Sequence, residues 1–249
     1  MRIVVDTSRN VTRLMEKISD RIRKSGVGAK VILENRISIE SDNKSIKTLV
    51  AETVAEFILE NFEKEIACCY LRTTELFKHE SEEVFKAMNS DEGLRRNRLE
   101  LLKKELMQYA ASGMINIDGL VAFRLKEYKE ELRFATELFA DEMAAKKSYD
   151  EFIGLMKYFA EIGSPVTETV VLREKFGEYS LTDADGNPLE LRFDEEFADE
   201  LASVELTGDD ILISNLMAAM PRKIIFDNVD EKKPIINTIN RIFEGRITH

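Results

Sequence analysis

The chain has 249 residues and carries 47 acidic against 36 basic side chains, a formal net charge of −11. Its 44% of apolar and 33% of charged residues are typical of soluble globular proteins and exclude an intrinsically disordered chain. No stretch approaches the roughly 18 apolar residues that span a bilayer. The first ten residues lack the apolar run of a secretory signal, so we expect a cytoplasmic protein.

The first third of the chain predicts a small α+β unit. Residues 2–5 form a strand, Thr7 or Ser8 can cap a helix, and Gly26 and Gly28 stop that helix. Two strands follow at residues 29–33 and 36–40, and the two residues between them fit a tight hairpin. A second amphipathic helix begins after residue 42 and reaches about residue 61.

The middle of the chain is helical, with breaks expected at Ser81, at residues 89–93 and at Gly113. Its strongest periodicity lies in residues 118–160, which we interpret as the organiser of the fold. A turn at Lys147 and Ser148 is expected to divide this stretch into two antiparallel helices. The seam of the first is Val121, Leu125, Tyr128, Leu132, Ala135 and Phe139; the inner face of the second is Tyr149, Phe152, Ile153, Met156 and Phe159.

The last third predicts a second α+β unit after the stop signal at residues 163–165. Strands are expected at residues 167–173, 179–182, 189–193 and 223–226, with a turn at residues 185–186. An acidic helix is expected near residues 194–203. Thr207 and Asp210 have capping spacing for the next helix, Pro221 ends it, and Pro234 opens the last one.

The predicted fold class is α+β and mainly helical, a central helical bundle flanked by small N- and C-terminal α+β units. We divide the chain into a basic βαββα unit with trailing helices at residues 1–90, a helical bundle at 91–165 and an acidic α+β unit at 166–249. Whether the strands of the two ends share one sheet is left open by the sequence.

Three segments together resemble the YtxC-like family of sporulation proteins. They are GLVAFRLKEY at residues 119–128, YDEFI at 149–153 with Tyr158 and Phe159, and DDILIS at 209–214 leading through Pro221 into KIIF at 223–226. The resemblance covers roughly the last three-fifths of the chain. It implies a cytoplasmic protein of spore-forming bacteria, and it supplies no catalytic residues.

Charge is unevenly placed along the chain. Residues 1–50 carry eleven basic and six acidic side chains, whereas residues 151–200 carry four basic and thirteen acidic ones. This asymmetry suggests a charged protein partner, including a second copy of the chain. A basic stripe on the first helix could track phosphates, dock on the acidic end of the chain, or be an ordinary solvated face; it consists of Arg9, Arg13, Lys17, Arg21 and Lys24.

Two further sites are candidates. Arg124, Lys126 and Tyr128 could bind an anion or a partner, although Arg124 can also pair with glutamates of its own helix and Tyr128 can pack in the seam. The acidic group Asp209, Asp210 and Asp227 could hold a hard metal ion, although Asp209 and Asp210 also suit a helix N-terminus.

Soft metal ligands are scarce, because Cys68 and Cys69 are adjacent and only His79 and His249 accompany them. We expect two buried thiols, no structural zinc and no cofactor. A histidine-based triad would have to involve His79. The aspartates of DADGNP, at residues 183–188, are expected in a hairpin turn, because the calcium-loop pattern places its glycine elsewhere.

The leading functional hypothesis is a non-enzymatic interaction or scaffold protein in a sporulation-related process. The alternative is a metal-dependent hydrolase or phosphotransferase that uses the acidic C-terminal group. We do not expect nucleic-acid binding, because the chain is acidic overall and no aromatic side chain interrupts the basic stripe.

Overall fold

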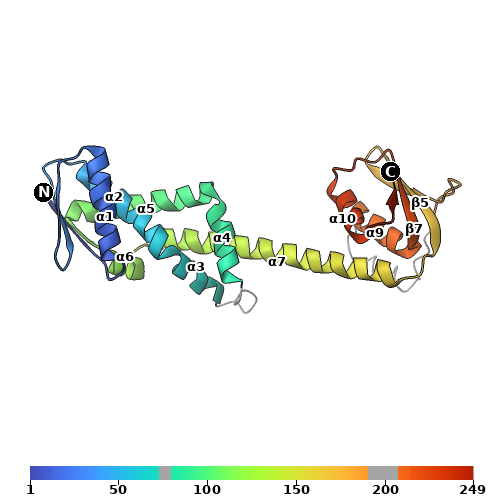
Figure 1. Ribbon diagram of the computed structural model, residues 1–249, viewed down its shortest axis with the longest axis horizontal. Helices are drawn as coiled ribbons and strands as arrows, with labels where there is room; N and C mark the ends of the chain where they lie inside the picture. The colour runs from blue at the N-terminus through green and yellow to red at the C-terminus, as the bar shows by residue number, and fades with distance from the viewer. Residues whose placement is uncertain (73–79, 190–206, 249) are drawn as a thin grey trace. The chain divides into compact units, whose positions relative to one another are not determined.

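The structure, a computed structural model, describes residues 1–72, 80–189 and 207–248 (Figure 1). It divides into two compact units, Met1–Ala144 and Ala145–His249. The described strands form two separate four-stranded sheets, and the mainly helical α+β class is confirmed. The three-part division of the chain stays a prediction. The acidic helix near residues 194–203, most of the strand at 189–193, and His79 and His249 lie outside the described residues.

The sheet of the first unit has the strand order β2-β3-β1-β4. Strands β2 (Lys30–Leu33) and β3 (Ile37–Glu40) form the predicted antiparallel hairpin, and β3 pairs antiparallel with β1 (Arg2–Asp6). The short strand β4 (Met114–Asn116) pairs parallel with β1 and was not predicted, because three residues carry too little alternation to be recognised.

Helix α1 (Val11–Ser25) buries Leu14, Ile18 and Ile22 and ends at Gly26, as predicted. The prediction that Thr7 or Ser8 caps it was wrong. Asn10 occupies the N-cap with a left-handed backbone, while the backbone and hydroxyl of Ser8 donate to Asp118 at 2.6 and 3.1 Å. A contact with a residue far along the chain has therefore replaced the local cap.

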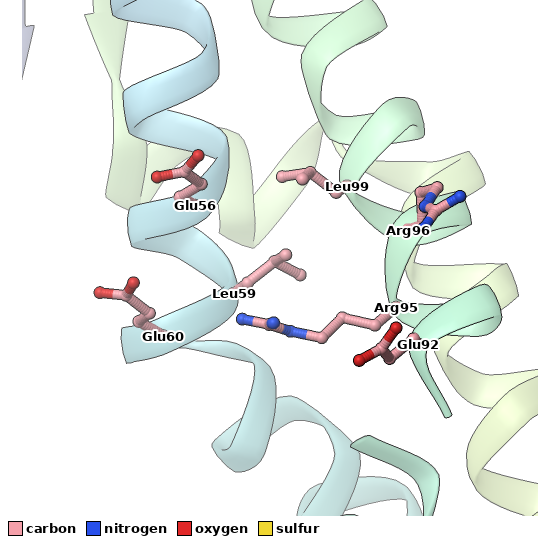
Figure 2. A pocket seen from close by; sticks show the side chains of 7 residues that line it. All are labelled: Glu56, Leu59, Glu60, Glu92, Arg95, Arg96 and Leu99. Carbon is pink, nitrogen blue, oxygen red and sulfur yellow. The ribbon is translucent and has the colours of Figure 1, made fainter. Parts of the chain in front are cut away.

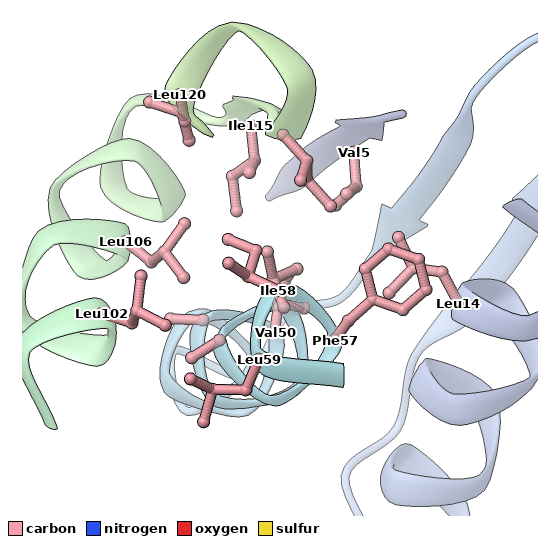
Figure 3. Packing of buried hydrophobic residues seen from close by; sticks show 14 of the residues in the cluster. Val5, Leu14, Val50, Phe57, Ile58, Leu59, Leu102, Leu106, Ile115 and Leu120 are labelled. Carbon is pink, nitrogen blue, oxygen red and sulfur yellow. The ribbon is translucent and has the colours of Figure 1, made fainter. Parts of the chain in front are cut away.

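Helix α2 (Ile46–Asn61) lies at the centre of the first core (Figure 3). Ten of its sixteen residues are buried, so it is enclosed on most of its circumference. Figure 3 shows side chains of α1, of the sheet and of α5 (Glu92–Ser112) converging on it. The central element of this unit is thus α2, rather than the stretch at residues 118–160.

The remaining helices of the first unit follow the predicted breaks. Helix α3 (Glu63–Arg72) follows α2, α4 (Ser81–Ser90) begins at Ser81, and α5 ends at Gly113. Gly113 has a φ of 84°, a conformation that side chains with a Cβ rarely adopt, and it allows the chain to turn directly into β4.

The expected helix pair at residues 118–160 is corrected by the structure. Helix α6 (Ile117–Phe123) is short, and α7 (Lys126–Ile162) then continues without a break through Lys147 and Ser148. Neither residue prevents helix formation, so the backbone hydrogen bonds of the helix continue through both of them. The predicted seam at Leu125, Tyr128, Leu132 and Ala135 is confirmed as buried.

The sheet of the second unit has the strand order β6-β5-β7-β8. The hairpin of β5 (Thr167–Lys175) and β6 (Glu178–Thr182) turns at Phe176 and Gly177, which have φ values of 56° and 86°. Strand β7 (Pro221–Asp227) pairs parallel with both β5 and β8 (Ile247–Thr248).

Two helices and the end of α7 complete the second core. Helix α9 (Gly208–Ala219) begins at the predicted capping box and ends before Pro221, and α10 (Pro234–Ile242) begins at Pro234. The core residues include Ile153, Val170, Leu216, Ile224, Ile236 and Ile239. Among the helices that the structure describes, none combines the length and apolar character needed to cross a membrane.

Candidate interaction surfaces

The basic stripe of α1 faces carboxylates of the next two helices. Lys17 Nζ lies 2.5 Å from Glu60 and 3.6 Å from Glu56, while Arg21 reaches Glu56 at 2.7 Å. Arg13 lies 3.6 Å from Glu60. Four of the five stripe residues thus belong to an ion-pair layer within the first unit, formed by Arg9, Arg13, Lys17, Arg21, Glu56, Glu60 and Glu65.

The N-terminal end of this layer is anchored by Arg9. Its guanidinium lies 2.5 Å from Glu65 of α3 and 4.6 Å from the centre of the Phe62 ring. The hydrogen bond from Arg9 lowers the pKa of Glu65. Lys24 is exposed in the last turn of α1, where a cation is favourable next to the helix dipole.

A groove of about 390 Å³ lies between α2 and α5 (Figure 2). Arg95 of α5 extends across it towards Leu59 of α2, and Glu92 lies beside the α5 end of the Arg95 side chain (Figure 2). Glu56 and Glu60 line the opposite wall, so the acidic row of α2 lies between the stripe of α1 and the arginines of α5. The groove is thus lined by side chains of both charges, with glutamates on the α2 wall and two arginines and one glutamate on the α5 wall.

Three polar side chains of the first unit are buried together. Arg98 of α5 and Glu63 of α3 are 0% and 1% exposed, with Arg98 Nε donating to Glu63 Oε1 at 2.9 Å. Tyr128 of α7 donates its hydroxyl to the other carboxylate oxygen at 3.1 Å. Each member comes from a different helix, so the cluster ties α3, α5 and α7 together.

Burial in this cluster favours the protonated, neutral forms of Glu63 and Tyr128. Burial raises the pKa of Glu63, and the charge of Arg98 and the hydrogen bonds from Arg98 and Tyr128 oppose that rise. Burial, followed by the nearby Glu63 carboxylate, also raises the pKa of the Tyr128 hydroxyl well above its usual range. The arrangement is structural, because all three side chains are closed off from solvent.

Sequence reasoning placed Tyr128 in the seam but missed Arg98 and Glu63. Both occur in strongly charged segments, EKE and RRNR, where the sequence gives no sign of which charge faces inward. The only available signal was spacing: Arg98 shares a helix face with Leu94, Leu102 and Leu106, at steps of four residues.

Arg124 and Lys126 lie apart from Tyr128. Arg124 is the exposed C-cap residue of α6 and Lys126 is the exposed first residue of α7, whereas the Tyr128 side chain is buried. Within the described part of the chain, Arg124 makes no ion pair with Glu127 or Glu131. The structure therefore does not gather these three predicted residues around one ligand.

The acidic C-terminal residues have local structural partners. Asp210 closes a capping box with Thr207, which lowers the pKa of Asp210, and Asp227 pairs with Arg173 at 2.5 Å. In residues 1–72, 80–189 and 207–248, no three His, Cys, Asp or Glu side chains are placed to share a metal ion. Asp183 accepts backbone hydrogen bonds from Asp185 and Asn187, which confirms the predicted turn.

A row of large apolar side chains is exposed on the C-terminal part of α7. We call it the α7 apolar face; its residues and exposed fractions are Phe152 46%, Leu155 49%, Tyr158 55%, Phe159 43% and Ile162 61%. The prediction of an inner face was correct for Ile153, which is buried, and wrong for Phe152, Phe159 and Tyr149, the last of which is 44% exposed. Ile153 and Ala160 occupy the side of α7 that packs into the second core.

Polar contacts fix the inward side of α7 against its own unit. Asp150 pairs with Arg241 of α10 at 2.7 Å, Lys157 pairs with Glu244, and Arg246 donates to the carbonyl of Ala160. The orientation of the helix is thus determined by contacts other than those of the α7 apolar face. That face is left directed away from the second core.

The match to the family model of the YtxC-like family extends over residues 43–248. The chain belongs to the YtxC-like family. The match starts well before the segments at residues 119–226 that carried the resemblance, and it includes α2, the ion-pair partners on it and the α7 apolar face. No curated protein and no solved structure matches the chain.

Proposed function

We propose that this YtxC-like protein is a non-enzymatic interaction protein that acts in a sporulation-related process in the cytoplasm. Membership of the family supports the process. The observation that carries the interaction role is the α7 apolar face, where five large apolar side chains are each at least 43% exposed within eleven residues.

Such a row is informative because single exposed apolar residues are common, whereas contiguous groups mark contact surfaces. Three of the five side chains are aromatic, the residue type enriched in the centres of protein interfaces. Tyr158 and Phe159 lie with their ring centres 6.0 Å apart and present a broad surface.

The charged surfaces, namely the basic stripe of α1 and the groove between α2 and α5, give weaker support for a protein partner. The basic stripe is largely neutralised by Glu56, Glu60 and Glu65 of its own unit, so its charge is not freely offered to an acidic partner. The groove between α2 and α5 could accept a peptide of mixed charge, but Glu56 and Glu60 on its α2 wall already have partners on α1. We therefore place the interaction role on α7.

The metal-dependent alternative stays a prediction, as does the absence of nucleic-acid binding. Asp210 and Asp227 each make a contact that explains their position without a cation. A calorimetric titration with Mg²⁺ or Mn²⁺ tests the alternative. Binding that is lost on Asp227→Asn would favour it.

The interaction role is tested in a spore-forming bacterium that carries the gene. Leu155→Glu places a carboxylate in the middle of the α7 apolar face, and we expect fewer heat-resistant spores at unchanged protein level. Gly154→Glu is the matched control: it adds the same charge at the adjacent exposed position, where an added Cβ meets no other atom. Equal spore counts for both variants and the wild type would contradict the proposal.

A further inference from the structure

We propose that the α7 apolar face binds the same face of a second copy of this chain. The inference rests on the proposed interaction role and names the partner. The contact would be helix against helix, with the row of Phe152, Leu155, Phe159 and Ile162 at its centre.

The spacing of the row fits a helical partner. Its members follow at steps of three, four and three residues, the alternation that keeps one stripe of a helix against another helix over successive turns. At 3.6 residues per turn, the five side chains of the face cover an arc of about 120°. An arc of that width can be covered by one helix of similar composition.

The exposed area reaches what a specific dimer requires. The exposed fractions of the five residues add up to about two and a half complete residues, which at about 200 Å² for each large side chain gives about 500 Å² per copy. Two copies would together bury about 1,000 Å², the area at which specific interfaces begin. A self-association of modest affinity is therefore expected.

The distribution of charge favours a second copy despite the net charge of −11. None of the five residues of the face is charged, and the nearby Asp150 and Lys157 are paired with Arg241 and Glu244 on the other side of the helix. Glu151 is exposed on the same side of α7, one turn before Leu155, so an antiparallel contact, which places the two copies of Glu151 at opposite ends, brings the apolar groups together without opposing these like charges. It is also self-complementary in character, as a two-fold symmetric interface requires, because aromatic and aliphatic side chains can interdigitate with their own copies.

Sedimentation velocity of the purified full chain over a concentration series tests the inference. We expect the wild type to change from 28.6 kDa to twice that mass as the concentration rises. Leu155→Glu should weaken the dimer by roughly 100-fold or more, because a buried carboxylate without a partner is costly. Gly154→Glu should leave the dissociation constant within about threefold of that of the wild type.

A second variant distinguishes loss of dimerisation from loss of folding. Ile162→Lys changes the most exposed member of the face, and we expect it to dissociate the dimer while keeping the wild-type circular dichroism spectrum. A wild type that stays monomeric at every concentration, or a Leu155→Glu variant that dimerises like the wild type, would overturn the inference.

The cellular and the solution experiments separate the two proposals. If the wild type is monomeric but Leu155→Glu still reduces spore counts, the self-association is wrong and the face binds another protein or a membrane surface. If the wild type is dimeric and spore counts do not change, the self-association holds and the proposed function fails.

Discussion

Arg98 and Glu63 form a buried ion pair. A buried charge such as that of Arg98 stabilises a fold only when an opposite charge lies next to it. Arg98 is fully buried, and its Nη1 has no hydrogen-bond partner among the described residues, so its desolvation is compensated mainly by Glu63 and incompletely. Glu63 in turn depends on Arg98 and on the hydroxyl of Tyr128. The pair specifies how three helices fit together more than it adds net stability.

Replacing one member of the pair should therefore lower the free energy of unfolding more than replacing both. We expect Arg98→Met to lower the free energy of unfolding of the first unit by about 3–5 kcal/mol at neutral pH, because it leaves a buried carboxylate unpaired. Adding Glu63→Leu should recover most of that loss. Urea unfolding measures both values, and Lys64→Met, in the exposed pair with Glu82, is a control expected to change the free energy of unfolding far less than Arg98→Met does.

The same variant should respond to pH in a defined direction. Burial already raises the pKa of Glu63, and loss of Arg98 removes an interaction that lowers it. A raised carboxyl pKa contributes stability that is present below the pKa of the unfolded chain, about 4.3, and is lost as pH rises through the folded-state value. The deficit of Arg98→Met should accordingly shrink as pH falls, and a deficit that grows in acid would contradict this assignment.

At the scale of the element, the ion-pair layer explains why α1 is so basic on one side. Its apolar residues fix α1 on the core, while Lys17 and Arg21 share Glu56 and Lys17 also reaches Glu60. Isolated surface pairs contribute little, but shared partners spread the entropic cost of holding each side chain. The layer therefore sets the register between α1 and α2.

This layer should weaken as salt is added. We expect the double variant Glu56→Gln and Glu60→Gln to lower the free energy of unfolding by on the order of 1 kcal/mol at low ionic strength, and by less at about 1 M salt, where the Debye length is about 3 Å. Glu16→Gln on the exposed side of α1 is the control, with a change within about 0.5 kcal/mol. A loss independent of salt would show that packing, rather than charge, holds the two helices in register.

For the whole molecule, two compact units with separate hydrophobic cores suggest that unfolding is not a single event. Helix α7 contributes residues to both cores, with Tyr128 and Leu132 in the first and Ile153 and Ala160 in the second. A continuous helix can propagate order between units, but each core is closed by its own sheet. Local stability should then differ between them.

We expect chemical denaturation, monitored by hydrogen exchange, to show two unfolding transitions. Arg98→Met should shift the transition of the first unit, and Ile236→Ala, which leaves a cavity in the second core, should shift the other by about 2–5 kcal/mol. One shared transition that both variants displace equally would contradict this expectation and indicate that α7 couples the units fully.

Much of the local structure was predictable, because short-range chemistry determines it. The breaks at Ser81 and Gly113, the capping box of Thr207 and Asp210 and the helix start at Pro234 all depend on residues within one turn. The three-residue strand β4 and the cap of α1 were missed because both depend on partners distant in sequence, β1 and Asp118.

Periodicity, turn residues and the order of segments were enough to predict the fold class, many element boundaries and the family. Which charges face inward and which apolar side chains remain outside depends instead on packing between elements distant in sequence. Arg98 and Glu63 look like surface residues in the sequence, whereas Phe152 and Phe159 look like core. The physical reason is that burial is decided by what packs against a helix, and a helix with apolar residues on two sides does not record which side its own unit will cover.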